Sequence, residues 1–158
     1  MNDFTHVDKN GKATMVDVGS KKISKRTATA RSIVILPEEV LIKFINGDIQ
    51  TKKGAVFQTA IIAGIMAAKK TGNLIPLCHP LGLDNCDINI TLNKKNELII
   101  DCTVSIEAKT GVEMEALVGA SIAALTVYDM CKALSHDIVI KETMLLKKTG
   151  GKKDFERK

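Results

Sequence analysis

Residues 110–132, TGVEMEALVGASIAALTVYDMCK, constrain the fold more than any other stretch of this chain. They begin with a threonine that can act as N-cap, and Glu113 and Glu115 fall in the first turn, as is typical of a helix start. The middle has only a serine and a threonine as polar side chains, so the helix must be covered on nearly every side. Polar groups return at the second end, with Asp129 and Lys132. We therefore expect the middle of this helix to pack and its ends to carry function.

The flanking segments predict an antiparallel sheet. Runs rich in β-branched residues or with alternating polarity predict four strands, at residues 26–36, 87–92, 97–108 and 137–146. Between the first two strands, helix signals predict two helices, at residues 37–46 and 54–70. This order indicates the split βαβ topology of a ferredoxin-like α+β sandwich, an antiparallel four-stranded sheet packed with helices.

Length and charge indicate one domain with polar ends. A chain of 158 residues fits a single domain over residues 1–158, with a loose N-terminal arm at 1–25 and a basic C-terminal tail at 147–158. That tail has six basic and two acidic residues, so it holds most of the net charge of +5. Aromatic residues make up only 3% of the chain and offer no stacking platform for bases. We expect no nucleic-acid partner.

The cysteines and the apolar segments indicate a cytoplasmic protein. Cys78, Cys86, Cys102 and Cys131 show neither CxxC pairs nor regular spacing, so we expect reduced thiols and no zinc site. The N-terminus lacks the basic-then-apolar build of a signal peptide. The apolar run of the central helix is expected to be too short to span a bilayer, so no membrane association is predicted.

Two features around the second helix have alternative interpretations. Lys52 and Lys53 precede its start, where free backbone N–H groups suit a phosphate, although a solvated polar turn is an equal alternative. Ala60, Gly64 and Ala68 recur every fourth residue and form a ridge of small side chains. Such a ridge allows close approach of another backbone. Tight packing on the protein's own sheet is favoured over a subunit contact.

The remaining candidates for chemistry are a loop histidine and the ends of the central helix. Pro80 holds His79 extended, which suits either a structural histidine or a proton-transfer group. Asp129 and Lys132 share a helix face, either as a surface ion pair or as an acid–base pair. Glu115 lies about 21 Å from Asp129 along the helix axis. One compact site cannot use both ends, so either the ligand is long or a second subunit completes the site.

Six motifs in this order resemble the cyclic pyranopterin monophosphate synthase family of molybdenum cofactor biosynthesis. They are MVDV, KKGAVFQTAIIAGIMAAKKT, LIPLCHPL, KTGVEMEAL, LTVYDMCKA and LLKKTGGKKDF, and they cover almost the whole chain. The resemblance implies a ferredoxin-like fold and a homohexamer, a trimer of dimers, with active sites between subunits. It also implies a phosphorus–oxygen lyase that converts the 3′,8-cyclic dihydro derivative of GTP to cyclic pyranopterin monophosphate and releases pyrophosphate.

The resemblance also implies roles for particular residues. The family's catalytic aspartate and its two functional lysines match Asp129, Lys53 and Lys132. Its substrate-binding positions match Leu77, Cys78, His79, Glu113, Met114, Glu115, Arg26 and Lys148, the last two on the phosphate side. No metal ligand set or cofactor is expected, although Mg²⁺ can accompany substrate phosphates.

These residues suggest a division of labour. We expect Asp129 to be the general base, Lys53 to be the general acid, and Lys132 to orient Asp129 and the ligand. His79 and Glu115 are expected to hold the purine-derived ring. An alternative from another class is a non-catalytic regulatory domain that binds a small ligand. A second alternative is an oligomeric phosphate-dependent lyase that acts on a different nucleotide.

Overall fold

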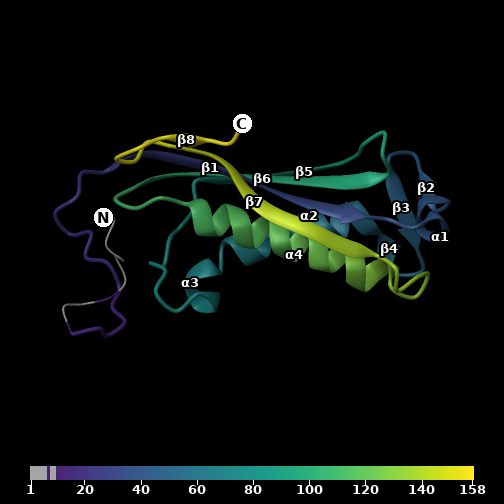
Figure 1. Ribbon diagram of the computed structural model, residues 1–158, viewed down its shortest axis with the longest axis horizontal. Coiled ribbons are helices and arrows are strands. Elements are labelled where there is room, and N and C mark those ends of the chain that lie inside the picture. The colour runs from purple at the N-terminus through teal and green to yellow at the C-terminus, as the bar shows by residue number, and fades with distance from the viewer. Residues whose placement is uncertain (1–6, 8–9) are drawn as a thin grey trace.

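A computed structural model describes residue 7 and residues 10–158 and shows a sheet with helices on one face (Figure 1). The large sheet has the strand order β5-β6-β1-β7-β8, in which every neighbouring pair is antiparallel. Its strands are β1 (Ser24–Ile35), β5 (Asn85–Leu92), β6 (Glu97–Ala108), β7 (Val139–Thr149) and β8 (Phe155–Glu156). The helices are α1 (Glu38–Leu41), α2 (Val56–Ala68), α3 (Thr71–Leu74) and α4 (Glu113–Cys131).

The connectivity of the larger elements is the split βαβ pattern. In chain order they run β1, α2, β5, β6, α4, β7, and β6 lies between β1 and β5 in the sheet. The predicted ferredoxin-like α+β sandwich is therefore confirmed, although the sheet has five strands and not the expected four.

The fifth strand comes from the segment that we expected to be a basic tail without regular structure. β7 continues to Thr149, three residues past the predicted end, and a turn at Gly150 leads to β8. Phe155 pairs with Lys148, and Arg157 donates its backbone N–H to the Leu146 carbonyl. Gly150 has a φ of 85°, and an added Cβ would collide with the Lys25 carbonyl, so only glycine fits this turn. The turn folds the end of the tail back along the outer edge of β7, opposite β1.

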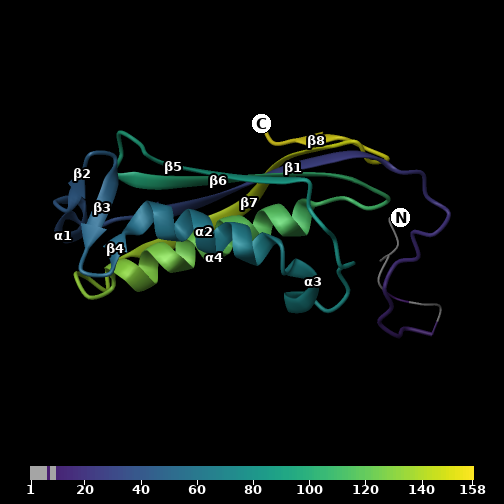
Figure 2. The same cartoon turned by 180° about the vertical axis from the view of Figure 1, so that it is seen from behind.

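The core lies between the sheet and the helix pair α2–α4. Alternate residues of β1 and β6 are buried, as the predicted period of two requires. Figure 2 shows α2 and α4 side by side below the sheet. The small-residue ridge faces α4: a Cβ added at Gly64 would lie 2.7 Å from the Gly119 carbonyl and would also meet Ile88. The ridge therefore packs within the domain, but against α4 as well as against β5 of the sheet, whereas we expected the sheet alone.

A second, small sheet replaces the predicted end of the first helix. Its strands, in the order β2-β3-β4, are Phe44–Ile45, Asp48–Thr51 and Gly54–Ala55. α1 ends already at Leu41, whereas we expected the helix to continue to Asn46-Gly47. Both of those residues have positive φ, 51° and 84°, and therefore form a two-residue hairpin turn. The signal that we interpreted as a helix stop is a β-turn.

The start of α4 also differs from the prediction. Thr110 is not the N-cap: the helix begins at Glu113, its N-cap is Val112, and no side chain caps it. Contrary to our expectation, the 19-residue α4 is long and apolar enough to cross a membrane by length and composition. Half of its apolar window is buried inside the domain, and Ala116, Ala120 and Ala124 are fully buried. Burial against the sheet and α2 accounts for this composition.

The expected arm is described only in part. Residues 1–6 and 8–9 lie outside the described residues. Between residue 10 and the start of β1 there is no helix or strand, and an isolated bridge joins Val7 to Ala13. Val16 lies against the loop that follows α3, through a contact with His79.

Candidate active site

The last turn of α4 carries a carboxylate held between two ammonium groups. Asp129 Oδ1 lies 2.7 Å from Lys132 Nζ, and Oδ2 lies 3.3 Å from Lys53 Nζ. Lys53 also approaches the Asp129 main-chain carbonyl, at 3.5 Å. The predicted neighbours on one helix face are confirmed, and the structure adds Lys53 from the turn between β3 and β4. All three side chains are about half exposed, so a ligand can reach them.

This arrangement fixes the charge of the carboxylate and of one lysine. The hydrogen bond from Lys132, and next the one from Lys53, lower the pKa of Asp129. The same hydrogen bond with Asp129 raises the pKa of Lys132. Asp129 is therefore ionised at neutral pH, as a general base must be, and Lys132 stays protonated, as befits a group that orients a carboxylate.

The phosphate site that we considered at the start of α2 is already occupied by the protein. The N-cap of α2 is Ala55, which has no capping side chain. Instead, Asp48 accepts hydrogen bonds from the backbone N–H groups of Phe57 and Gln58. A carboxylate therefore satisfies the donors that a phosphate would need, and that interpretation of the Lys52-Lys53 motif is wrong.

At the other end of α4 a pocket of about 480 Å³ opens beside the LCHPL loop. It gathers seven of the eight predicted substrate-binding residues, namely Leu77, Cys78, His79, Glu113, Met114, Glu115 and Lys148. The eighth, Arg26, lines an adjoining pocket that shares Glu113 and Lys148. The structure therefore brings these eight residues to two adjoining pockets.

His79 joins the loop to the N-terminal segment. Its Nε2 lies 2.9 Å from the Val16 carbonyl, which can only accept, so Nε2 carries a hydrogen in this contact. In a neutral ring with the hydrogen on Nε2, Nδ1 is a hydrogen-bond acceptor. The loop is held from behind as well, since Gly72 lies against the backbone of Pro80.

Glu115 is buried at this pocket, and Cys78 beside it is partly buried. The Glu115 residue is only 4% exposed, and burial, followed by the charge of Glu113, raises the pKa of its carboxyl. Burial and then Glu115 raise the pKa of the Cys78 thiol. The thiol therefore stays protonated and neutral, which fits contact with a ligand better than nucleophilic attack.

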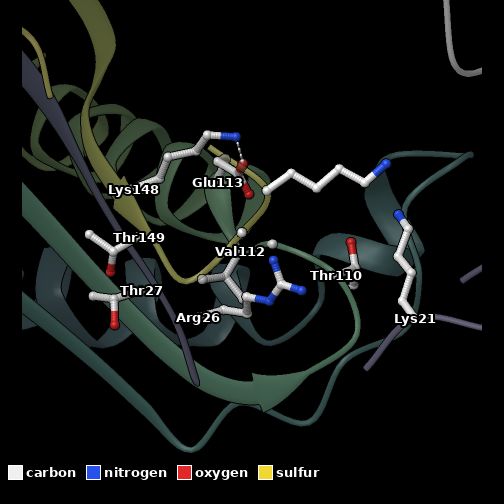
Figure 3. Close-up of a pocket in the computed structure, with 11 residues that line it drawn as sticks. Lys21, Arg26, Thr27, Thr110, Val112, Glu113, Lys148 and Thr149 are labelled. Carbon is white, nitrogen blue, oxygen red and sulfur yellow. Dashed lines mark hydrogen bonds and ion pairs between the residues drawn. The ribbon is translucent and has the colours of Figure 1, made fainter. Parts of the chain in front are cut away.

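The adjoining pocket, of about 210 Å³, is lined by cations (Figure 3). Lys148 donates to Glu113 Oε1 at 2.8 Å, which leaves a single carboxylate among several positive groups. Arg26 donates to the carbonyls of Ala108 and Lys109 at 3.4 and 3.5 Å. These contacts hold the guanidinium beside the space that an anionic ligand would enter.

Two lysines of this pocket were missed in the sequence. Lys21 lines both pockets and comes from the N-terminal arm, and Lys152 comes from the turn between β7 and β8. Lys21 lies in the segment that we expected to be a loose arm, and Lys152 lies in the basic tail, which we expected to be solvated or to hold an anion locally. The signal available was the cluster of basic residues at each end of the chain, but only the pairing of β1 with β7 shows that these ends meet.

The two groups of residues lie at opposite ends of one helix. In Figures 1 and 2 the start of α4 lies towards α3, whereas its end lies towards β4 and the small sheet. The lysine–aspartate cluster and the pocket therefore face different regions of the surface of one chain. Among residues 7 and 10–158 there is no group of three or more His, Cys, Asp and Glu that could hold a metal ion. All four cysteines are free, as predicted.

A ferredoxin-like α+β domain with an ionised carboxylate–lysine cluster and a cation-lined pocket defines a protein that handles a small anionic molecule. Residues 15–151 match the MoaC family, and the chain belongs to that family.

Named relatives are similar over nearly the whole chain. A cyclic pyranopterin monophosphate synthase of Xanthomonas campestris pv. campestris is 52% identical over 152 residues, which cover 96% of this chain and 92% of the relative. One of Bacillus thuringiensis subsp. konkukian is 49% identical, over 100% of this chain and 99% of the relative. Molybdenum cofactor biosynthesis protein 1 of Dictyostelium discoideum is 51% identical, but this chain covers only 27% of its length. The molybdenum cofactor biosynthesis bifunctional protein of Synechocystis is 52% identical, and this chain covers 46% of its length.

Proposed function

We propose that this chain is a cyclic pyranopterin monophosphate synthase of molybdenum cofactor biosynthesis. It converts the 3′,8-cyclic dihydro derivative of GTP to cyclic pyranopterin monophosphate and releases pyrophosphate, as a phosphorus–oxygen lyase. The observation that carries this proposal is the ionised Asp129 between two lysines, combined with a separate cationic pocket for a polyphosphate. Relatives of nearly the same length bear the name of this enzyme.

The site is completed by two subunits. Asp129, Lys53 and Lys132 of one chain face the pocket around His79 and Glu115 of its partner. This arrangement is supported by the separation of the two groups, because about 21 Å of helix lies between Glu115 and Asp129. Neither group alone combines proton transfer with a pocket for the ring. We propose a homohexamer built as a trimer of such dimers.

Each group of residues has a role in the reaction. Lys148 and Arg26 neutralise the phosphates, while His79, Glu115 and the neighbouring Leu77, Cys78 and Met114 hold the purine-derived ring. Asp129 takes the protons that the ring rearrangement releases, and Lys53 returns a proton to the breaking C–N bond. A sugar hydroxyl attacks the α-phosphate, forms the cyclic phosphate ester and displaces pyrophosphate, whose charge the cationic pocket stabilises.

The remaining parts of the proposal concern the setting of the enzyme. Residues 1–158 form a single catalytic domain, which acts in the cytoplasm, as four free cysteines favour. The protein itself holds no metal or cofactor, and Mg²⁺ can accompany the substrate phosphates.

Turnover of the purified chain tests this function. The chain is incubated with the 3′,8-cyclic dihydro-GTP derivative, and pyrophosphate and cyclic pyranopterin monophosphate are measured by chromatography, with GTP as the control substrate. We expect both products in equal amounts from the cyclic compound and neither from GTP. Binding of the cyclic compound without turnover would instead indicate a ligand-binding domain, and turnover of GTP a lyase for another nucleotide.

A further inference from the structure

We propose that Asp48 is a positioning residue, which sets Lys53 against Asp129 by fastening the β3–β4 hairpin to the start of α2. Asp48 touches no substrate in this account and acts only through Lys53. The catalytic part of this inference rests on the proposed function, whereas its geometric part does not.

The carboxylate of Asp48 makes three hydrogen bonds to backbone N–H groups. Oδ1 accepts from Ile49 at 2.6 Å and from Phe57 at 2.8 Å, and Oδ2 accepts from Gln58 at 3.3 Å. Phe57 and Gln58 lie in the first turn of α2, where N–H groups have no partner within the helix. Because the N-cap residue Ala55 has no side-chain hydrogen-bond acceptor, Asp48 of β3 caps the helix instead.

The hairpin that begins at Asp48 has little freedom of its own. Gln50 pairs with Ala55, and Thr51 pairs with Gly54. Within the turn, Lys53 donates its N–H to Thr51 Oγ1, and that hydroxyl lies 3.1 Å from the Gly54 carbonyl. The position of the Lys53 backbone is therefore determined by where the hairpin is attached. Asp48 attaches β3 to α2 by hydrogen bonds, and β4 is attached to α2 because the chain runs directly from β4 into that helix.

The contact between Lys53 and Asp129 cannot set this geometry alone. Its two distances are 3.3 and 3.5 Å, and both side chains are more than half exposed. Ion pairs between exposed groups contribute little, because water competes for the charges and the long lysine loses rotamer freedom. The position of Lys53 must therefore be fixed by the buried side of the hairpin, where Ile49, next to Asp48 in sequence, is fully buried.

The hairpin that Asp48 begins reaches the end of α4 through Lys53, whose Nζ lies 3.3 Å from Asp129 Oδ2 and 3.5 Å from the Asp129 carbonyl. Asp48 itself contacts the first turn of α2, through Phe57 and Gln58. The charge of Asp48, after burial, contributes to raising the pKa of the Cys131 thiol to about 11. The charged groups that face Asp129 within the described chain are Lys132 from α4 and Lys53 from the hairpin.

The test replaces Asp48 and a matched residue of another hairpin. Asp48→Ala removes the cap. Asn93→Ala is the control, because Asn93 Oδ1 accepts the N–H groups of Lys95 and Glu97 in the β5–β6 turn, at 2.8 and 2.9 Å. Asp48→Asn keeps an acceptor for Phe57 but loses the negative charge at the helix start. The readouts are the pKa of Asp129 by carboxyl-carbon NMR, the urea midpoint, and kcat and KM.

Loss of the Lys53 contact must raise the pKa of Asp129, because Lys53 is the second contributor to its lowering. We expect the pKa of Asp129 to rise in Asp48→Ala and to rise less in Asp48→Asn. In Asn93→Ala we expect no rise of this pKa, although the urea midpoint falls by a similar amount. We expect kcat to fall about tenfold in Asp48→Ala with little change in KM, because misplacement of a catalytic group affects the reacting step.

An unchanged pKa of Asp129 in Asp48→Ala would overturn the proposal, as would a kcat that falls only as far as in Asn93→Ala. If Asp48→Ala does not fold, the same comparison is made with Asp48→Asn, and an Asp129 pKa equal to that of the wild type overturns the proposal. The NMR measurement needs no turnover. An inactive wild-type chain would therefore contradict the proposed function. The pKa of Asp129 in the Asp48 variants would still show whether Asp48 positions Lys53.

Discussion

Glu115 and Asp129 belong to the same helix but lie about four turns apart, at its two ends. Glu115 is buried in the pocket beside the LCHPL loop, whereas Asp129 is half exposed between Lys53 and Lys132. The middle of the helix between these two residues has a structural role, because its alanines are fully buried against the sheet and α2. α4 thus separates the residues proposed to bind the ring from those proposed to transfer protons, which is why the proposed site needs two chains.

Replacement of the proposed base should abolish turnover without harming the fold. Asp129→Asn keeps the shape of the side chain but removes the group that accepts a proton, so we expect kcat to fall about a hundredfold or more. Asp129 is half exposed, and its thermal midpoint should therefore change little. Asp137→Asn, at an exposed carboxylate in the loop after α4, is the matched control. Near wild-type turnover by Asp129→Asn would show that another group is the base.

The ion pair between Glu113 and Lys148 should weaken the binding of anions. Glu113→Gln frees Lys148 from a partner at 2.8 Å and leaves the cationic pocket without its carboxylate. A partly exposed pair is worth up to about 1 kcal/mol, so we expect pyrophosphate to bind up to about fivefold more tightly. Isothermal titration calorimetry measures this, with Glu142→Gln as the control at an exposed position on β7. Weaker binding by Glu113→Gln would mean that the carboxylate helps to hold the ligand.

Glu115 should make the folded protein less stable as the pH rises. Its pKa is raised in the folded state, so the folded protein binds the proton more tightly than the unfolded chain does. The resulting stabilisation is full below the ordinary pKa of a glutamate and is lost as the pH rises through the raised value. Glu115→Gln should therefore match the wild type at pH 4 and exceed its thermal midpoint at pH 7. Since 1 kcal/mol shifts the midpoint of a domain this size by about 2–4 °C, scanning calorimetry can detect the difference.

The outcome that contradicts this prediction is a constant difference between Glu115→Gln and the wild type across that pH range. A constant difference would mean that the carboxyl has the same pKa in the folded and unfolded states, and that burial does not govern its charge.

The close approach of α2 and α4 should depend on glycine. Gly64→Ala places a methyl group 2.7 Å from the Gly119 carbonyl, a backbone atom that cannot move aside without shifting a helix. Overpacking of this kind costs about 1–3 kcal/mol, measurable as a lower urea midpoint. Gly82→Ala is the control, because nothing lies within 4 Å of its added methyl group. Equal midpoints for the two variants would show that the helices have room to separate.

The larger elements could be predicted because their signals are local and agree with each other. Alternation in β1 and β6 and the all-round apolar middle of α4 match the observed burial closely. The errors fall where one signal has two structural meanings. Asn46-Gly47 ends a helix or turns a hairpin with equal ease, and only the pairing of Phe44 with Ile49 decides between them.

The residues named by the motifs could be predicted from the sequence, but the residues that position them or join them from distant segments could not. The motif residues could be named, and the pairing of Asp129 with Lys132 followed from their spacing. Contacts between distant segments could not be foreseen. Asp48 caps a helix that starts eight residues later, and Lys21 and Lys152 reach one pocket from opposite ends of the chain. Such contacts depend on strand register, which a single sequence does not specify.

The mixing of two inactive variants tests the shared site most directly. Lys53→Ala damages the lysine–aspartate cluster and His79→Ala damages the pocket, so a mixed dimer regains one intact site and keeps one with both defects. With random exchange of subunits, an isologous dimer predicts recovery of about one quarter of wild-type activity. If each chain instead used its own Lys53 and His79, verified mixed oligomers would stay as inactive as the two parents, and the two-subunit account would be wrong.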